Sequence, residues 1–302
     1  MLDYSALAAM ACVIREGSFE RAAQQLGITP SAVSQRVRGL EERLGAILIR
    51  RGQPCTATDL GRMLCAHVDH VRLLEAELAP ALSPALSPGG INAAPPAISL
   101  AINADSLATW FPAAAASFMR QSGLMLDLTL DDEKHTAERL RSGEVLGAIT
   151  ADPEPAPGCR SVALGALDYI ACASPDFMQR HFADGVTVRS LSTAPCMGFD
   201  RRDNLQMRWA REVHGADIDP PTLWVPSTHA FVDFALAGVA WAMQPVQLAA
   251  PHLAAGRLAE LTPGAMISVP LFWNVVRLHA ASLKLLSDAV VRSGRQLLRR
   301  SI

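Results

Sequence analysis

The stretch that decides the fold spans residues 18–44 and reads SFERAAQQLGITPSAVSQRVRGLEERL. Ser18 is a residue type that favours the start of a helix, and Gly27-Ile28-Thr29 can form a tight turn. Thr29 can then cap a further helix that has Pro30 at its first position. Residues 3–15 add a helix before this pair. The segment therefore predicts three short helices, of which the last two form a helix-turn-helix.

The last of these helices has an apolar side and a polar side. The apolar stripe consists of Val33, Val37, Leu40 and Leu44. The opposite side carries no acid and presents Ser31, Gln35 and Arg38, with Ser34 beside them. Glutamine can pair bidentately with adenine and arginine with guanine. An ordinary solvated face would have the same composition, so the flanking segments decide between the two interpretations.

A wing follows the helix-turn-helix. Residues 48–58, LIRRGQPCTAT, predict a short strand pair around a Gly/Pro turn with two adjacent arginines. Between residues 31 and 62 there are six arginines against three acids, which favours contact with a phosphate backbone. The residues expected to contact DNA are Thr29, Pro30, Ser31, Ser34, Gln35, Arg36, Arg38, Arg50 and Arg51.

A long helix is predicted from the cap at Thr58 to about Ala79, where Pro80 stops it. Its apolar positions follow a heptad pattern and give a predicted dimer seam at Leu60, Leu64, Val71, Leu74 and Leu78. The alternative is that this stripe packs on the chain's own second domain. His67 and His70 lie one turn apart, but two histidines without further ligands indicate seam or solvent positions rather than a metal site. A Pro-rich linker follows over residues 80–97.

From residue 97 onwards short apolar strands alternate with amphipathic helices, which predicts an open, mostly parallel α/β sheet with two lobes. The first units are strands at 98–102, 124–130 and 145–150 and helices at 106–120 and 133–142. We expect a winged helix-turn-helix over 1–58, a linker helix and hinge over 59–90, and a ligand-binding domain over 91–302. Lobe I would comprise about 91–166 and 267–302, and lobe II about 167–266.

Ligands of open α/β sheets bind where strands end and helices begin. The residues expected there are Asn103, Asp105, Ser106, Asp132, Glu133, Asp200, Ser227 and Thr228. The hydroxyls could hold a carboxylate and the acids a cation, which suits a small molecule with one carboxylate and a cationic group. Asp and Ser at helix starts are also common as simple caps, and that alternative stays open for each of them.

Composition and motifs exclude several classes. Half of the residues are apolar and 19% are charged, which is typical of a globular chain. No Gly-rich phosphate loop, G-x-S-x-G elbow or H-E-x-x-H motif is present, so we expect no enzyme, metal or cofactor. No apolar run is long enough to cross a membrane, and no export signal is recognisable at the N-terminus. Together with six scattered cysteines, this favours a cytoplasmic protein.

The chain resembles the LysR-type transcriptional regulators. The resemblance rests on Ala22-Ala23, Leu26, Thr29-Pro30-Ser31-Ala32-Val33-Ser34, Val37, Leu40-Glu41, Leu44-Gly45, Leu48, Arg51, Thr58 and Gly61. In the second half, residues 99–110 (SLAINADSLATW), 139–145 (RLRSGEV) and 164–169 (LGALDY) resemble the ArgP/LysG branch of that family. Arg50 and Pro226 depart from the pattern: the first adds charge at the wing, and the second puts the contribution of the Ser227/Thr228 loop in doubt.

The resemblance implies an α+β chain with a winged helix-turn-helix, a linker helix and a periplasmic-binding-protein-like effector domain of two α/β lobes. It implies a regulator that senses lysine or arginine and controls an amino-acid exporter. The implied partners are promoter DNA, a second copy in a homodimer that assembles further as a dimer of dimers, and RNA polymerase. A LysR-type regulator with another effector, or an amino-acid-binding transport protein, remains an alternative.

Overall fold

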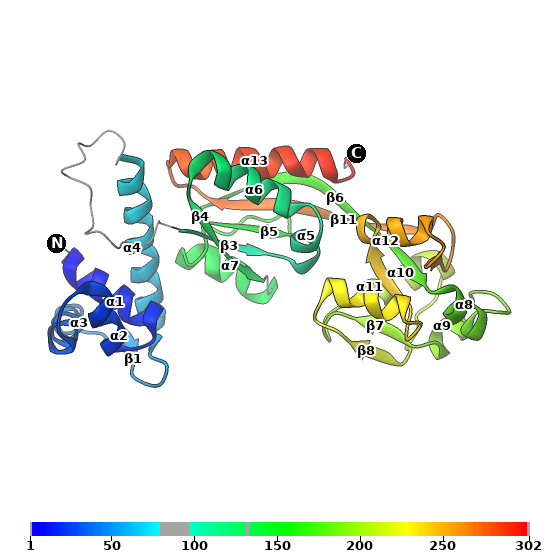
Figure 1. Ribbon diagram of the computed structural model, residues 1–302, viewed down its shortest axis with the longest axis horizontal. Helices are drawn as coiled ribbons and strands as arrows, with labels where there is room; N and C mark the ends of the chain where they lie inside the picture. Colours follow the sequence, from blue (N-terminus) through cyan, green and yellow to red (C-terminus); the bar gives the residue numbers. More distant parts are fainter. Residues whose placement is uncertain (1, 79–96, 131–132, 301–302) are drawn as a thin grey trace.

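The computed structural model of the chain describes residues 2–78, 97–130 and 133–300. Three bodies lie in a row: a helical N-terminal domain, a lobe next to the linker helix and a second, distal lobe (Figure 1). The Pro-rich linker predicted at 80–97 lies outside the described residues apart from Ala97. Within the described residues, no helix combines the length and the hydropathy needed to cross a bilayer.

The N-terminal domain confirms the predicted helix starts. It consists of α1 (Tyr4–Glu16), α2 (Phe19–Leu26) and α3 (Pro30–Leu44). The Ser18 hydroxyl caps α2 and the Thr29 hydroxyl caps α3, with Pro30 at the first helical position. Gly27 ends α2 in the left-handed conformation at φ 63°, which other residues rarely adopt. Three members of the predicted α3 stripe are buried, but the fourth, Leu44, is 39% exposed at the end of the helix.

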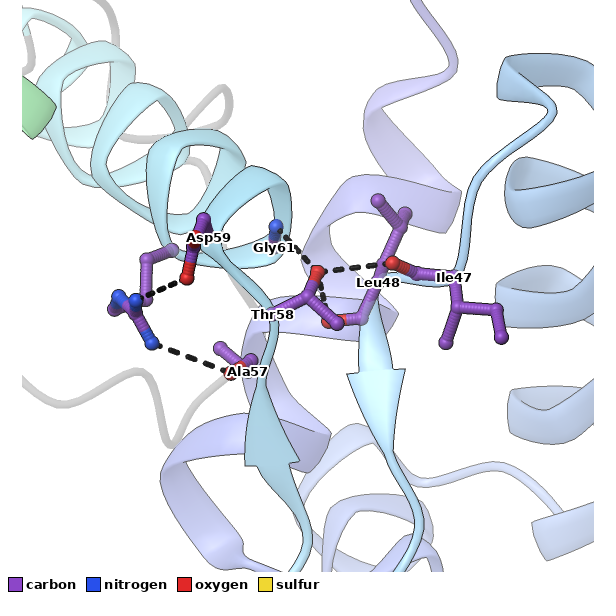
Figure 2. Close-up of polar contacts among 7 residues, drawn as sticks. Ile47, Leu48, Ala57, Thr58, Asp59 and Gly61 are labelled. Carbon is purple, nitrogen blue, oxygen red and sulfur yellow. Dashed lines mark hydrogen bonds and ion pairs between the residues drawn. The ribbon is translucent and has the colours of Figure 1, made fainter.

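The wing is an antiparallel pair, β1 (Ile49–Arg50) and β2 (Thr56–Ala57), and α4 (Asp59–Leu78) follows at once. Thr58 joins them (Figure 2). Its hydroxyl accepts from the Gly61 N–H at 3.1 Å and lies 2.9 Å from the Ile47 carbonyl, to which it can donate. The Thr58 N–H donates to the Leu48 carbonyl at 2.9 Å. One threonine thus fixes where the linker helix leaves the wing.

Gly61 should not tolerate a side chain, because a Cβ there would lie 2.2 Å from the Leu48 carbonyl oxygen. We expect Gly61→Ala to lower the free energy of unfolding by about 1–3 kcal/mol through overpacking. Thermal unfolding measures this. The control is Gly39→Ala on α3, where a Cβ meets nothing within 4 Å and alanine is the better helix former. Equal melting points for the two variants would contradict the close contact.

The linker helix packs on both of its neighbours within the chain. Tyr4 on α1 bonds His67 at 3.0 Å, and Arg15 pairs with Asp69. On the other side, Leu73 is buried in the core of the effector domain. The alternative of packing on the chain's own second domain therefore holds for one side of α4. It does not hold for the predicted dimer seam, much of which stays exposed.

The effector domain is built on one seven-stranded sheet with the order β10-β6-β11-β5-β3-β4, in which β9 also pairs with β6. Its strands are β3 (Ala97–Ile102), β4 (Met125–Leu130), β5 (Gly147–Thr150), β6 (Cys159–Ala173), β9 (Ala242–Pro245), β10 (Ala259–Glu260) and β11 (Met266–Val276). A separate parallel pair, β7 (Cys196–Gly198) and β8 (Thr222–Trp224), lies in the distal lobe.

Helices cover both lobes (Figure 1). They are α5 (Ala104–Ala108), α6 (Phe111–Ser122), α7 (Glu133–Ser142), α8 (Pro175–His181), α9 (Val188–Thr193), α10 (Leu205–His214), α11 (Thr228–Leu236), α12 (Val246–Ala254) and α13 (Ala281–Leu297). The helix predicted over 106–120 is in fact two, α5 and α6. The fully buried Trp110 lies between them, where its indole fills the core of the first lobe.

The expectation of a mostly parallel sheet is wrong. Within the seven-stranded sheet the described parallel pairs are those of β3 with β4 and β5, whereas β6 and β11 are long antiparallel partners of each other. Both strands run from one lobe into the other, so the lobes are joined by continuous backbone (Figure 1). The lobe boundary at 166/167 stays a prediction, and it falls inside β6, beside the register shift at Leu271/Phe272 of β11.

Candidate DNA-reading face and effector site

One face of α3 is free to meet a ligand as large as DNA. Gln35 and Arg36 are exposed, and Thr29, Pro30 and Ser31 are exposed around the start of the helix. Ser34 is half-buried. Arg38 leans along the helix to Glu42, with 2.8 Å between Nε and Oε1. Exposed pairs of this kind are weak, so a phosphate or a base can compete for this guanidinium group.

The wing presents both of its arginines. Arg50 and Arg51 are exposed, and the Arg51 guanidinium lies 5.6 Å from the centre of the Phe19 ring on α2. That contact orients Arg51 beside the helix-turn-helix while the group keeps its charge. The two arginines and the polar face of α3 therefore belong to one small domain that combines an exposed helix face with positive charge.

Glu41 has a role that the sequence did not reveal. Its carboxylate accepts from the Leu48 N–H at 2.8 Å and from the Ile49 N–H at 3.3 Å. It therefore holds the first wing strand against α3 and is not a free negative charge facing DNA. Side chains that bond to backbone beyond a turn leave no periodic signal, which is why the sequence could not assign this one.

The predicted dimer seam on α4 remains largely uncovered within one chain. Leu60, Leu74 and Leu78 are 36%, 37% and 58% exposed. Val71 is half-buried, and Leu64 packs in part against the core of the N-terminal domain. Exposed leucines along one helix are typical of a surface that a partner covers.

Two of the expected ligand-binding residues meet between the lobes. The Asp105 carboxylate, on α5, accepts from the Thr228 hydroxyl at the start of α11 at 2.6 Å. It also accepts from the Tyr169 hydroxyl on β6 at 2.6 Å. Residues 105 and 228 are 123 positions apart in sequence and come from the two lobes. One carboxylate thus bridges the two lobes at this site.

This carboxylate lies in an unfavourable electrostatic environment. Burial raises the pKa of Asp105, the hydrogen bonds from Thr228 and Tyr169 oppose the rise, and the nearby charge of Asp203 adds to it. Burial also raises the pKa of Tyr169 well above its ordinary value, so the phenol stays protonated and donates. A cation placed beside Asp105 and Asp203 would offset the desolvation cost of the Asp105 carboxylate and its repulsion by Asp203.

Asn103 and Ser106 each make a hydrogen bond within the segment around α5. The Asn103 side chain caps α5 by accepting from the Ser106 N–H at 2.7 Å. Ser106 is fully buried, and its hydroxyl accepts from the Trp110 indole N–H at 3.0 Å. The prediction of a Ser106 hydroxyl open to a carboxylate therefore needs correction: in this structure the side chain anchors the core tryptophan.

The remaining candidates fall into two groups. The Asp200 carboxylate is compensated within its own turn, where Arg202 pairs with it at 2.8 Å and holds its pKa below the ordinary value. Ser227 is exposed and caps α11. Asp132 lies outside the described residues, as does the side chain of Glu133, so both stay predictions.

Sequence reasoning missed Tyr169 and Asp203, because neither follows directly on a predicted strand end.

Contacts between α4 and the first lobe provide a mechanical link. The Glu77 carboxylate accepts from the backbone N–H groups of Ala281 at 3.1 Å and Ser282 at 2.7 Å, and so caps α13. His70 packs against Gly143, where a Cβ would approach the ring to 3.0 Å. Among the described residues, no cluster of His, Cys, Asp and Glu is arranged to hold a metal ion.

Two family models match the chain. Residues 4–62 match the bacterial regulatory helix-turn-helix protein of the lysR family, and residues 94–296 match the LysR substrate binding domain. The chain is 42% identical over 298 residues to the HTH-type transcriptional regulator ArgP of Pseudomonas fluorescens, which covers 99% of both proteins.

Solved structures agree with the fold of the whole chain. The crystal structure of ArgP from Mycobacterium tuberculosis superposes with a TM-score of 0.81 at 37% identity and covers all of both chains. Full-length LysG from Corynebacterium glutamicum with bound effector Arg superposes with a TM-score of 0.71 at 36% identity, covering 99% of this chain and all of that one.

Proposed function

Because the chain belongs to the LysR family of transcriptional regulators and is of the ArgP/LysG type, we propose that it reads promoter DNA with α3 and the wing and answers a basic amino acid bound between its lobes. The observation that carries the effector proposal is the Asp105 carboxylate, bonded across the lobes to Thr228 and to Tyr169.

The exposed face of α3 supports insertion into the major groove. Gln35 is exposed and can pair with adenine, whereas Arg51 at the wing suits a phosphate. Thr29, Pro30, Ser31, Ser34, Arg36, Arg38 and Arg50 complete the proposed DNA contacts.

Two variants separate base reading from phosphate contact. Gln35→Ala should lose about 1–3 kcal/mol of discrimination at one base pair, because a bidentate base contact disappears. Arg51→Ala should weaken binding to all DNA sequences alike, because it removes a phosphate contact. It should also reduce the slope of log affinity against log salt concentration by about one unit. Fluorescence anisotropy against operator and scrambled duplexes at several salt concentrations measures both. If Gln35→Ala loses the same affinity on both duplexes, α3 does not read bases.

The chemistry of the inter-lobe site supports a basic effector. Asp105 and Asp203 put negative charge where the lobes meet, and a lysine or arginine side chain would compensate it. LysG of Corynebacterium glutamicum, which this chain resembles over its full length, has been solved with bound effector Arg. The first N–H groups of α11 and the exposed Ser227 hydroxyl beside them suit the carboxylate of the ligand.

Calorimetry on the full chain tests the effector class. Arginine and lysine should give heats, and each at about a hundred times its dissociation constant should add about 2.7 kcal/mol to the folded state. An aromatic acid or a neutral metabolite should give neither. If such an acid binds and both basic amino acids fail, the regulator has another effector, which is the second candidate.

The conformational change caused by ligand binding would be transmitted to the DNA-binding domain through α4. A change in lobe angle shifts the first lobe against the linker helix, which is attached at Leu73 and through the Glu77 cap on α13. We further propose that the chain works in the cytoplasm as a homodimer that pairs into a dimer of dimers on the promoter. It would act with RNA polymerase on an amino-acid exporter gene.

A further inference from the structure

Residues of α13 and β6 line a basic hollow on the lobe next to the linker helix. Figure 1 shows where these two elements lie in that lobe. The hollow has a volume of about 590 Å³. Arg160 of β6, Arg292 and Arg295 of α13, and Arg300 just beyond that helix line it. We call it the arginine hollow. Neither the DNA-reading face nor the inter-lobe site includes any of these residues.

None of the four guanidinium groups is paired with an acid in the part of the chain that the structure describes. In the ranges 2–78, 97–130 and 133–300, none of the four forms an ion pair or a side-chain hydrogen bond. Of the nine lining residues one is acidic, Asp288, and its carboxylate already pairs with Lys284 at 2.8 Å. Like charges gathered without partners repel each other, so an anion would be attracted to this place.

Such pairing is common elsewhere on the surface. Three exposed arginines pair with an acid one helical turn away: Arg38 with Glu42, Arg180 with Asp176 and Arg208 with Glu212. On α13 the one acid at this spacing, Asp288, lies one turn before Arg292 but pairs with Lys284 instead, and no acid lies one turn from Arg295 within the helix. The excess of positive charge is therefore a local property of this hollow and not of the protein, whose net charge is −2.

Hydrogen bonds tie the backbone that carries these arginines to the sheet. The Trp273 indole N–H on β11 donates to the Ser287 hydroxyl of α13 at 3.1 Å, which ties the helix to the sheet. The end of the helix is tied as well, because Arg299 and Ala166 exchange backbone hydrogen bonds at 2.8 and 3.0 Å. Because both sides are tied to the sheet, the backbone positions from which the four exposed arginines reach the hollow are fixed before any ligand binds.

We propose that the arginine hollow binds an organic polyphosphate of the nucleoside di- or triphosphate class. Guanidinium groups bind phosphate oxygens bidentately, and four of them suit a chain of phosphates better than a single carboxylate. The volume exceeds what one phosphate fills, and Val162 and Val291 add apolar lining for an organic body. This ligand carries the opposite charge to the proposed effector, so the two sites do not compete.

Calorimetry on the full chain without DNA tests the proposal, with ADP, inorganic tripolyphosphate and adenosine as probes. ADP and tripolyphosphate should bind and adenosine should not. The double variant Arg292→Gln/Arg295→Gln should weaken ADP about tenfold or more, because it removes two charge-assisted contacts. Arg160→Gln should also weaken ADP binding. Because Arg160 lies on β6, a loss in this variant cannot result from misfolding of α13.

The matched control is Arg120→Gln/Arg189→Gln, which removes two exposed arginines of the same domain outside the hollow. It should leave ADP affinity within about twofold, because screened charges at a distance contribute little. Equal losses of ADP affinity in both double variants would show that the effect comes from the overall charge of the domain and not from the arginine hollow. The absence of heat with ADP and tripolyphosphate, or an Arg292→Gln/Arg295→Gln variant that loses DNA affinity but keeps ADP, would overturn the proposal.

Discussion

Asp105→Asn should abolish most of the response to a basic amino acid while leaving the ligand-free protein folded. The substitution keeps the size of the side chain and removes the charge that would pair with the ligand. Truncating one partner of a buried charge pair costs about 2–5 kcal/mol, which corresponds to a loss in affinity of about 30-fold or more. Calorimetric titration of the full chain with arginine and with lysine measures it.

The ligand-free stability should move in the opposite direction. Because burial raises the pKa of Asp105 in the folded protein, its ionised form costs stability at every pH above that raised value. The cost disappears below the ordinary pKa of aspartate, where the carboxyl is protonated in both states. Asp105→Asn should therefore be at least as stable as the wild type at neutral pH, and chemical denaturation at two pH values measures the difference.

The same pKa predicts how effector binding depends on pH. A bound cation favours the ionised carboxylate and lowers the pKa of Asp105, so binding releases a proton below the raised pKa of the free protein. Affinity for arginine should rise with pH up to that value and level off above it. The Asn variant should lose this dependence.

The control is Asp176→Asn, which removes the same charge from an exposed pair with Arg180 on α8. Surface pairs contribute about 0–1 kcal/mol, so both arginine affinity and stability should stay close to the wild type. If Asp105→Asn binds arginine as tightly as Asp176→Asn does, the effector does not contact Asp105 and the assignment of this site is wrong.

Local signals explain why the N-terminal domain could be predicted. A cap such as Thr29, a helix-starting Pro30 and a terminating Gly27 act within one turn of their own position, and the structure has all three where the sequence indicates. Sheet partners are different. The apolar stretches of β6 and β11 do not specify the direction of their neighbours, so their antiparallel pairing across both lobes was missed.

The effector site shows the same limit at the level of single residues. Asp105 and Thr228 were predicted at one edge, and they meet there. Ser106 was placed at that edge because serine favours helix starts, but the nearby Trp110 needs a hydrogen-bond acceptor in the core and takes its hydroxyl. Tyr169 lies inside a strand, where alternation alone does not tell a core tyrosine from one that reaches a ligand site.

Leu74→Asp should convert the protein to monomers. In a single chain Leu74 is 37% exposed, whereas its neighbour Leu73 is 2% exposed and belongs to the effector-domain core. An aspartate at position 74 therefore leaves the fold of the chain intact. In a dimer seam formed by α4 it would place a charge without a partner inside the interface, which costs about 3–5 kcal/mol.

Sedimentation without DNA measures this effect, with Leu44→Asp as the control. Leu44 is 39% exposed at the end of α3, so the substitution adds the same charge at nearly the same exposure but away from the linker helix. We expect dimers or larger assemblies for Leu44→Asp and monomers for Leu74→Asp. Because helix-turn-helix dimers bind two half-sites with two recognition helices, the monomer should also bind operator weakly. A Leu74→Asp protein that sediments like the control would show that α4 does not form the interface between copies.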